Sequence, residues 1–231
     1  MPLKMVLVAA LGSLFCLDRA CPQFMISRPI VVAPFIGWVL GDVMTGLVVG
    51  AFLELMWVDR PAMGNYVPPG DSLVSAVVAG SVVFVGRGMG GVTPELIVLA
   101  VLLLLPLAYA AQRMDMHLMT GNDALSDQAM EDARNDRPAE IEKKHLLALG
   151  KMYLLSFAFI LACTALAVAV LGFVYPRLPG SLLTALGLLY FVFPVLIIAV
   201  VLHSIKVNHK EAVFALLFAA VVFAVQWAHG F

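Results

Sequence analysis

Charged residues are scarce in this sequence. Asp, Glu, Lys and Arg make up 13% of its 231 residues, whereas an ordinary soluble domain has roughly 25%. Hydrophobic residues reach 62%, and the mean hydropathy is +1.00. Such a composition excludes an ordinary soluble protein and predicts that the chain lies in a lipid bilayer.

Other absences exclude classes of function. The net charge is −1 and there is no cluster of Lys and Arg, so nothing indicates a nucleic-acid partner. The three cysteines, Cys16, Cys21 and Cys163, form no Cys-x-x-Cys pair, so we expect them to serve packing rather than a metal site. No phosphate loop, catalytic triad or His-Glu-x-x-His motif occurs. We therefore expect no catalytic residue, metal or cofactor in this chain.

The few charges are concentrated in one segment. Residues 113–151 contain eight acidic and six basic residues, and we expect this segment to be a water-exposed helical connector or a docking surface for a soluble partner. Long runs without Asp, Glu, Lys or Arg lie outside it, at 96–112, 152–176, 178–205 and 212–231. Because a helix needs about 20 predominantly apolar residues to cross a bilayer, three or four of these runs can do so.

The N-terminal half is broken into shorter pieces. The apolar stretch Ile30–Val58 is too long for one helix of normal length, and it predicts two helices joined near Gly41-Asp42. Residues 60–71 carry three prolines and two glycines and cannot form a regular helix. Ser72–Gly86 is a run too short for an upright span, and Thr93-Pro94 is typical of a helix start. Broken helices of this kind line the substrate path in transporters and channels.

We therefore predict an all-α, polytopic integral membrane protein with re-entrant or discontinuous helices in its N-terminal half. Residues 1–231 are expected to form a single membrane domain. Within it, 1–112 is the interrupted half that bears the site, 113–151 is the polar connector, and 152–231 forms transmembrane helices.

One carboxylate stands in the middle of an apolar stretch. Glu54 follows Gly46 and Gly50 at intervals of four, so the three residues share one helix face. Small residues let a neighbouring helix approach closely, and we expect Glu54 to point into protein rather than lipid. Its carboxyl group could be protonated and bonded to the backbone, or it could accept hydrogen bonds from the hydroxyls of a substrate.

A second carboxylate, Asp71, follows Pro68-Pro69-Gly70 at the start of an apolar run. It is expected either to cap the helix that begins there or to bind a ligand. Asn65 and Trp57 add an amide and an indole to the same neighbourhood. Carboxylates, amides and aromatic faces together suit a sugar, because its hydroxyls need polar partners and its C–H faces need apolar surface.

Motifs of a known family run through residues 12–73. They are Leu17-Asp18-Arg19, Arg28-Pro29, Gly37-x-x-x-Gly41-Asp42, Thr45-Gly46, Leu53-Glu54-Leu55 and Pro68-Pro69-Gly70-Asp71-Ser72-Leu73. The chain resembles the membrane-embedded IIC component of mannose-type (mannose/fructose/sorbose) sugar phosphotransferase systems. Two departures, the inserted Gly70 and the charged pair Asp59-Arg60, lie beside the expected site and leave the identity of the sugar open.

The resemblance implies a multi-pass sugar permease of the bacterial inner membrane. It implies a IID membrane subunit as partner in an oligomeric complex, with soluble IIA and IIB components that relay phosphate from phosphoenolpyruvate, so that this chain is not itself an enzyme. The candidate sugar-binding residues are Glu54, Asp71, Asn65, Asp42 and Trp57.

Two other functions fit the same residues. An ion-coupled secondary transporter would use Glu54 and Asp71 as cation or proton ligands and would need no phosphoryl donor. A membrane sensor or scaffold would pass signals through residues 113–151 and would carry no sugar flux.

Overall fold

The computed structural model describes residues 2–57, 67–204 and 213. All regular structure within these residues is helical, which confirms the predicted fold class. The elements are α1 (Pro2–Leu17), α2 (Pro29–Leu40), α3 (Val43–Trp57), α4 (Asp71–Gly88), α5 (Pro94–Leu104), α6 (Leu107–Arg134), α7 (Pro138–Val174), the 3-10 helix η1 (Tyr175–Arg177) and α8 (Gly180–Ser204).

Helix α4 lies at the centre of the bundle. Every residue from Ser72 to Gly86 is buried, and α4 contacts every helix from α1 to α7. Its side chains are small, so neighbours approach closely; a Cβ added at Gly80 would lie 3.1 Å from a methyl carbon of Val8 on α1. The hydroxyl of Ser75 donates to the carbonyl oxygen of Asp71 at 2.6 Å, so this polar group is satisfied within the helix itself.

The predicted break at Gly41-Asp42 separates α2 from α3. Gly41 adopts φ +81°, a left-handed conformation that glycine tolerates at a helix end, and the chain turns back there. The two helices have 12 and 15 residues, which makes them about 18 and 22 Å long. Neither reaches across the hydrocarbon core of about 30 Å, as expected for discontinuous helices.

The face of α3 that carries Gly46 and Gly50 packs on α2. A Cβ added at Gly46 would lie 2.8 Å from the Cα of Pro34, and one added at Gly50 would lie 2.7 Å from the carbonyl oxygen of Pro29. Both distances are too short for a real Cβ, so the two helix backbones approach this closely only because the side chains are missing. The shared face predicted from the four-residue spacing is confirmed.

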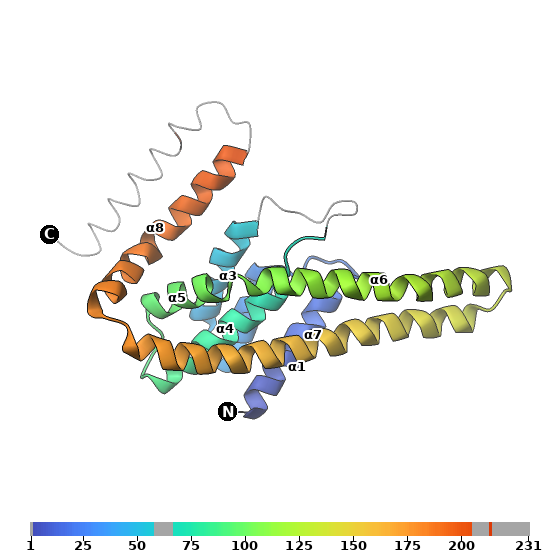
Figure 1. The fold of residues 1–231 in the computed structure, drawn as a ribbon, viewed down its shortest axis with the longest axis horizontal. Coiled ribbons are helices and arrows are strands. Elements are labelled where there is room, and N and C mark those ends of the chain that lie inside the picture. Colours follow the sequence, from blue (N-terminus) through green and yellow to red (C-terminus); the bar gives the residue numbers. More distant parts are fainter. Residues whose placement is uncertain (1, 58–66, 205–212, 214–231) are drawn as a thin grey trace.

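The polar segment 113–151 folds as a helical hairpin made of the second part of α6 and the first part of α7. Figure 1 shows α6 and α7 side by side, with their connecting turn far from the other helices. Helix α6 is also bent by 41° relative to α5, at Leu105-Pro106, where proline removes a backbone donor. The apolar run 96–112 is therefore interrupted, which the composition did not indicate.

Within the described residues, two helices are long and apolar enough to cross a membrane, namely α4 and the unit Pro138–Arg177, and the bent pair α5–α6 makes a third if it counts as one span. Helix α4 reaches 18 residues because it begins one residue before the apolar run Ser72–Gly86 and ends two residues after it. Thr93 caps α5 as predicted, since its hydroxyl oxygen accepts from the backbone N–H of Leu96 at 3.3 Å.

We expect the substitution Gly46→Ala to lower the Tm of the full chain in detergent. The added methyl would meet the backbone of α2, and overpacking of this kind costs about 1–3 kcal/mol. The matched control is Gly121→Ala on α6, where nothing lies within 4 Å of an added Cβ and alanine is the better helix former. Thermal unfolding followed by circular dichroism measures both, and an equal Tm for the two variants would contradict the close α2–α3 contact.

Candidate functional site

The segment between α1 and α2, residues 18–28, is folded around Asp18. This side chain is only 2% exposed, and its two carboxylate oxygens accept from the backbone N–H groups of Phe24 at 2.7 Å and Ser27 at 3.2 Å. We call residues 18–28 the α1–α2 segment. Because a buried carboxylate needs such partners, Asp18 closes this segment into a fixed loop.

The side chain of Glu54, on α3, lies beside the first residues of α2, as the shared glycine face requires. Its Oε1 pairs with Nη1 of Arg28 at 2.9 Å, and its Oε2 accepts from the backbone N–H of Ile30 at 3.4 Å. The first N–H groups of a helix have no partner within the helix and favour a negative charge. The prediction that Glu54 points into protein is therefore confirmed, and its partners there are Arg28 and the backbone of α2.

Asp71 is the first residue of α4, and Gly70 holds the cap position without a side-chain cap. Oδ1 of Asp71 accepts from the backbone N–H of Ser72 at 2.7 Å and lies 3.5 Å from Nη2 of Arg19. All the contacts found for this carboxylate within the described residues involve Oδ1. Oδ2 of Asp71 is thus left to accept a hydrogen bond from a ligand.

Arg19 joins Asp71 to two other parts of the chain. Its Nη1 donates to Oδ2 of Asp115 on α6 at 2.9 Å, and its Nη2 donates to the carbonyl oxygen of Pro69 at 3.4 Å. The side chains of Arg19 and Asp115 are 18% and 13% exposed. Shielding from water strengthens the attraction between these charges and also raises the cost of desolvating them. Through its contacts, Arg19 connects the ends of α1 and α4 to α6.

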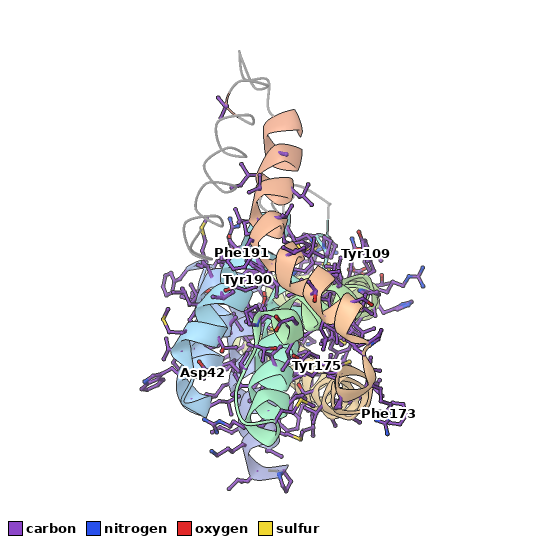
Figure 2. The ribbon with its side chains drawn as sticks, turned by 90° about the vertical axis from the view of Figure 1, so that its left-hand side faces the viewer. Asp42, Tyr109, Phe173, Tyr175, Tyr190 and Phe191 are labelled. Carbon is purple, nitrogen blue, oxygen red and sulfur yellow. The ribbon has the colours of Figure 1, made fainter. Side chains whose placement is uncertain are left out.

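The other three candidate residues lie elsewhere. Both carboxylate oxygens of Asp42 bond to Thr45, one to its backbone N–H at 3.0 Å and one to its hydroxyl at 2.6 Å, so Asp42 caps α3. Glu54 follows twelve positions later, about 18 Å along the helix. Figure 2 shows Asp42 beside the blue helices α2 and α3, away from Tyr190 of α8. Trp57 is buried in the core, and Asn65 lies outside the described residues.

The structure therefore brings Glu54 and Asp71 to the two ends of one segment. Each carboxylate is paired with an arginine of the α1–α2 segment, and each keeps oxygen lone pairs for a further donor. No group of three or more His, Cys, Asp or Glu side chains suited to a metal ion is found in the part of the chain that the structure describes.

Arg19, Arg28 and Asp115 were not predicted as site residues. The two arginines stand in the motifs Leu17-Asp18-Arg19 and Arg28-Pro29, and a cation next to apolar helices is a signal that a buried carboxylate is near. Asp115 carried no such signal, because it stands near the start of the charged segment 113–151. A shallow depression lined by Leu118, Lys151, Leu154 and Leu155 on α6 and α7 is mostly apolar and contains none of the candidate residues.

Several curated proteins share sequence with this chain. It is 29% identical over 143 residues to the PTS system sorbose-specific EIIC component of Klebsiella pneumoniae, which is 62% of this chain and 48% of that protein. It is 26% identical over 147 residues to the PTS system mannose-specific EIIC component of Escherichia coli strain K12, or 64% of this chain and 52% of that protein. The chain spans about half the length of the curated relatives it matches.

Solved structures of membrane proteins share the fold. One, described as the structure of a membrane protein, has a TM-score of 0.71 and 22% identity, covering 96% of this chain and 87% of that one. The mannose transporter ManYZ in complex with microcin E492 has a TM-score of 0.60 at the same identity and coverage.

The family described as the PTS system sorbose-specific IIC component matches residues 2–227. This chain therefore belongs to the family of sorbose-specific IIC components of the PTS.

Proposed function

We propose that this chain is the sugar-binding and sugar-translocating IIC subunit of a phosphoenolpyruvate-dependent phosphotransferase system in a bacterial inner membrane. The family match over residues 2–227 carries this proposal. The paired carboxylates support it, because Glu54 and Asp71 lie beside discontinuous helices, where transporters bind their substrates. In this proposal residues 1–231 act as one membrane domain, and Glu54 and Asp71 accept hydrogen bonds from the sugar.

Phosphoryl transfer in this proposal belongs to other subunits. Soluble IIA and IIB components relay the phosphoryl group from phosphoenolpyruvate to the sugar, and a IID subunit completes the membrane complex. The exposed side of α2 and α3 supports a membrane partner, since Trp38 and Met44 are 63% and 68% exposed there. A large exposed apolar surface marks contact with protein or lipid.

The arginine pairs argue against an ion-coupled transporter. A secondary transporter would need Glu54 or Asp71 as a cation or proton ligand, but each lies within 3.5 Å of a guanidinium nitrogen. A positive charge at that distance repels a second cation. A hydroxyl group meets no such repulsion, so the geometry favours a sugar as the ligand of these carboxylates.

The first test concerns Glu54. We expect Glu54→Gln to weaken sugar binding roughly 5- to 150-fold, because losing a charge-assisted hydrogen bond costs about 1–3 kcal/mol, while the protein stays in the membrane. Calorimetry with mannose and sorbose on the purified membrane complex measures the affinity. Glu131→Gln on the exposed part of α6 is the matched control, and an unchanged affinity in the Glu54 variant would refute its role.

The second test separates the two roles of Asp71. The amide oxygen of asparagine can keep the bond from the backbone N–H of Ser72, and Arg19 keeps Asp115 and the carbonyl oxygen of Pro69, so Asp71→Asn should fold with little loss of Tm. Sugar uptake should nevertheless fall at least tenfold, since the variant loses the negative charge that Arg19 orients. Asp127→Asn on α6 is the control, and normal uptake by Asp71→Asn would leave Asp71 with a structural role alone.

The third test concerns partners. Expressed alone, the chain should transport no sugar; co-expressed with its IID subunit, it should co-purify and bind sugar. Addition of phosphoenolpyruvate and the soluble components to vesicles should then convert sugar to sugar phosphate, with no phosphoryl label retained on this chain. Uptake of sugar by the single subunit without phosphoenolpyruvate would instead show a secondary transporter, and a complex with no sugar flux would show a sensor or scaffold.

A further inference from the structure

We propose that Arg19 and Arg28 are positioning residues for sugar binding and that the α1–α2 segment couples the two carboxylates they hold. This inference rests on the proposed function of Glu54 and Asp71. It assigns a role to the motifs Leu17-Asp18-Arg19 and Arg28-Pro29, which the sugar-binding carboxylates leave unexplained.

The α1–α2 segment is held in one conformation. Besides the two bonds to the carboxylate of Asp18, the backbone N–H of Gln23 donates to the carbonyl oxygen of Asp18 at 2.9 Å. Gln23 and Met25 have φ values of +67° and +63°, which are unfavourable for residues with a side chain. Such conformations persist only where surrounding bonds enforce them, and they occur often at functional sites.

The two arginines stand at opposite ends of this segment and hold different helices. Arg28 directly precedes α2 and reaches Glu54 of α3 through one nitrogen at 2.9 Å. Arg19 directly follows Asp18 and uses both terminal nitrogens, one for Asp115 and the other for Asp71 and Pro69. A displacement of the segment would therefore change the surroundings of both carboxylates.

The contacts assign to Arg19 a positioning role rather than contact with the sugar, whereas Arg28, which is 38% exposed, pairs with Glu54 alone among the described residues. The guanidinium of Arg19 has three acceptors on the protein within 3.5 Å, and its side chain is 18% exposed. Asp71 keeps Oδ2 for a ligand, and Glu54 keeps part of its acceptor capacity. Each arginine thus fixes the direction in which the remaining acceptors point.

The geometry predicts that sugar binding tolerates a lysine at position 28 but not at position 19. Lysine can replace a single contact but cannot reproduce a planar fork that serves three acceptors. In the complex with IID, Arg28→Lys should keep the affinity for mannose or sorbose within about threefold of the original, whereas Arg28→Gln and Arg19→Lys should weaken it about 10- to 100-fold. Arg134→Gln is the control, because Arg134 pairs with Glu131 on the exposed part of the α6–α7 hairpin.

A double-mutant cycle distinguishes positioning from direct contact and from general destabilisation. If Arg28 acts through Glu54, the combined Arg28→Gln and Glu54→Gln variant should bind sugar no more weakly than Glu54→Gln alone. If the fold-loss of affinity in the combined variant equals the product of the two single fold-losses, Arg28 acts independently of Glu54 and the proposal is overturned. So would Arg28 and Arg19 variants that lower the Tm but leave the affinity of the folded complex unchanged.

Hydrogen exchange tests the segment without any sugar. In the IID complex, Arg28→Gln should speed exchange of the backbone N–H of Ile30, and Asp18→Asn should speed that of Phe24 and Ser27, each at least tenfold over the Arg134→Gln control. If the original complex binds no sugar, the proposed function fails, and faster exchange still supports a segment held by these residues. If the complex binds sugar but the exchange of these N–H groups is unchanged in the variants, the positioning role is overturned while the proposed function stands.

Discussion

The close approach of α2 to α3 depends on two glycines of α3, which carry a hydrogen atom where other residues carry a Cβ. At Gly46 and Gly50 the backbones of the two helices leave no room for a methyl group. This contact fixes the rotation of α3 about its axis, and the rotation in turn decides where the residue one turn further along will point. Glu54 is that residue, and it accepts from the backbone N–H of Ile30 at the start of α2 and from the guanidinium of Arg28. The position of a carboxylate at the candidate site thus follows from the absence of side chains one and two turns away.

Charge balance accounts for the rest of the site. A carboxylate shielded from water is costly unless it is paired and hydrogen-bonded, and the described chain meets this requirement with two arginines from one short segment. The segment itself is organised by a third carboxylate, Asp18, which bonds only to backbone N–H groups among the described residues. Asp18 of the loop itself, Glu54 of α3 and Asp71 of α4 therefore all depend on contacts made by the same eleven-residue loop.

Local features of the sequence predicted the parts of the fold that have local causes. The break at Gly41-Asp42 and the start of α5 at Thr93-Pro94 follow from the backbone preferences of glycine and proline, and the shared face of Gly46, Gly50 and Glu54 follows from helical periodicity. The partners of the carboxylates could not be predicted in this way. Arg19 and Asp115 are 96 positions apart, and no spacing rule connects them; Asp115 also stands in a charged stretch whose other members are mostly exposed. The proline bend between α5 and α6 was missed because hydrophobic composition alone does not show where a helix is interrupted.

The short length of α2 and α3 ties this protein to the thickness of its membrane. Their outward sides carry exposed apolar residues such as Val31, Trp38, Met44 and Leu47, but helices of about 18 and 22 Å cover only part of a hydrocarbon core of about 30 Å. The lipids beside them must compress, or other protein must cover the remaining depth, and hydrophobic mismatch costs a fraction of a kcal/mol for each Å. Longer acyl chains raise that cost and shorter ones relieve it. The acyl-chain composition of the surrounding bilayer is therefore one of the variables that set the stability of the helices around Glu54.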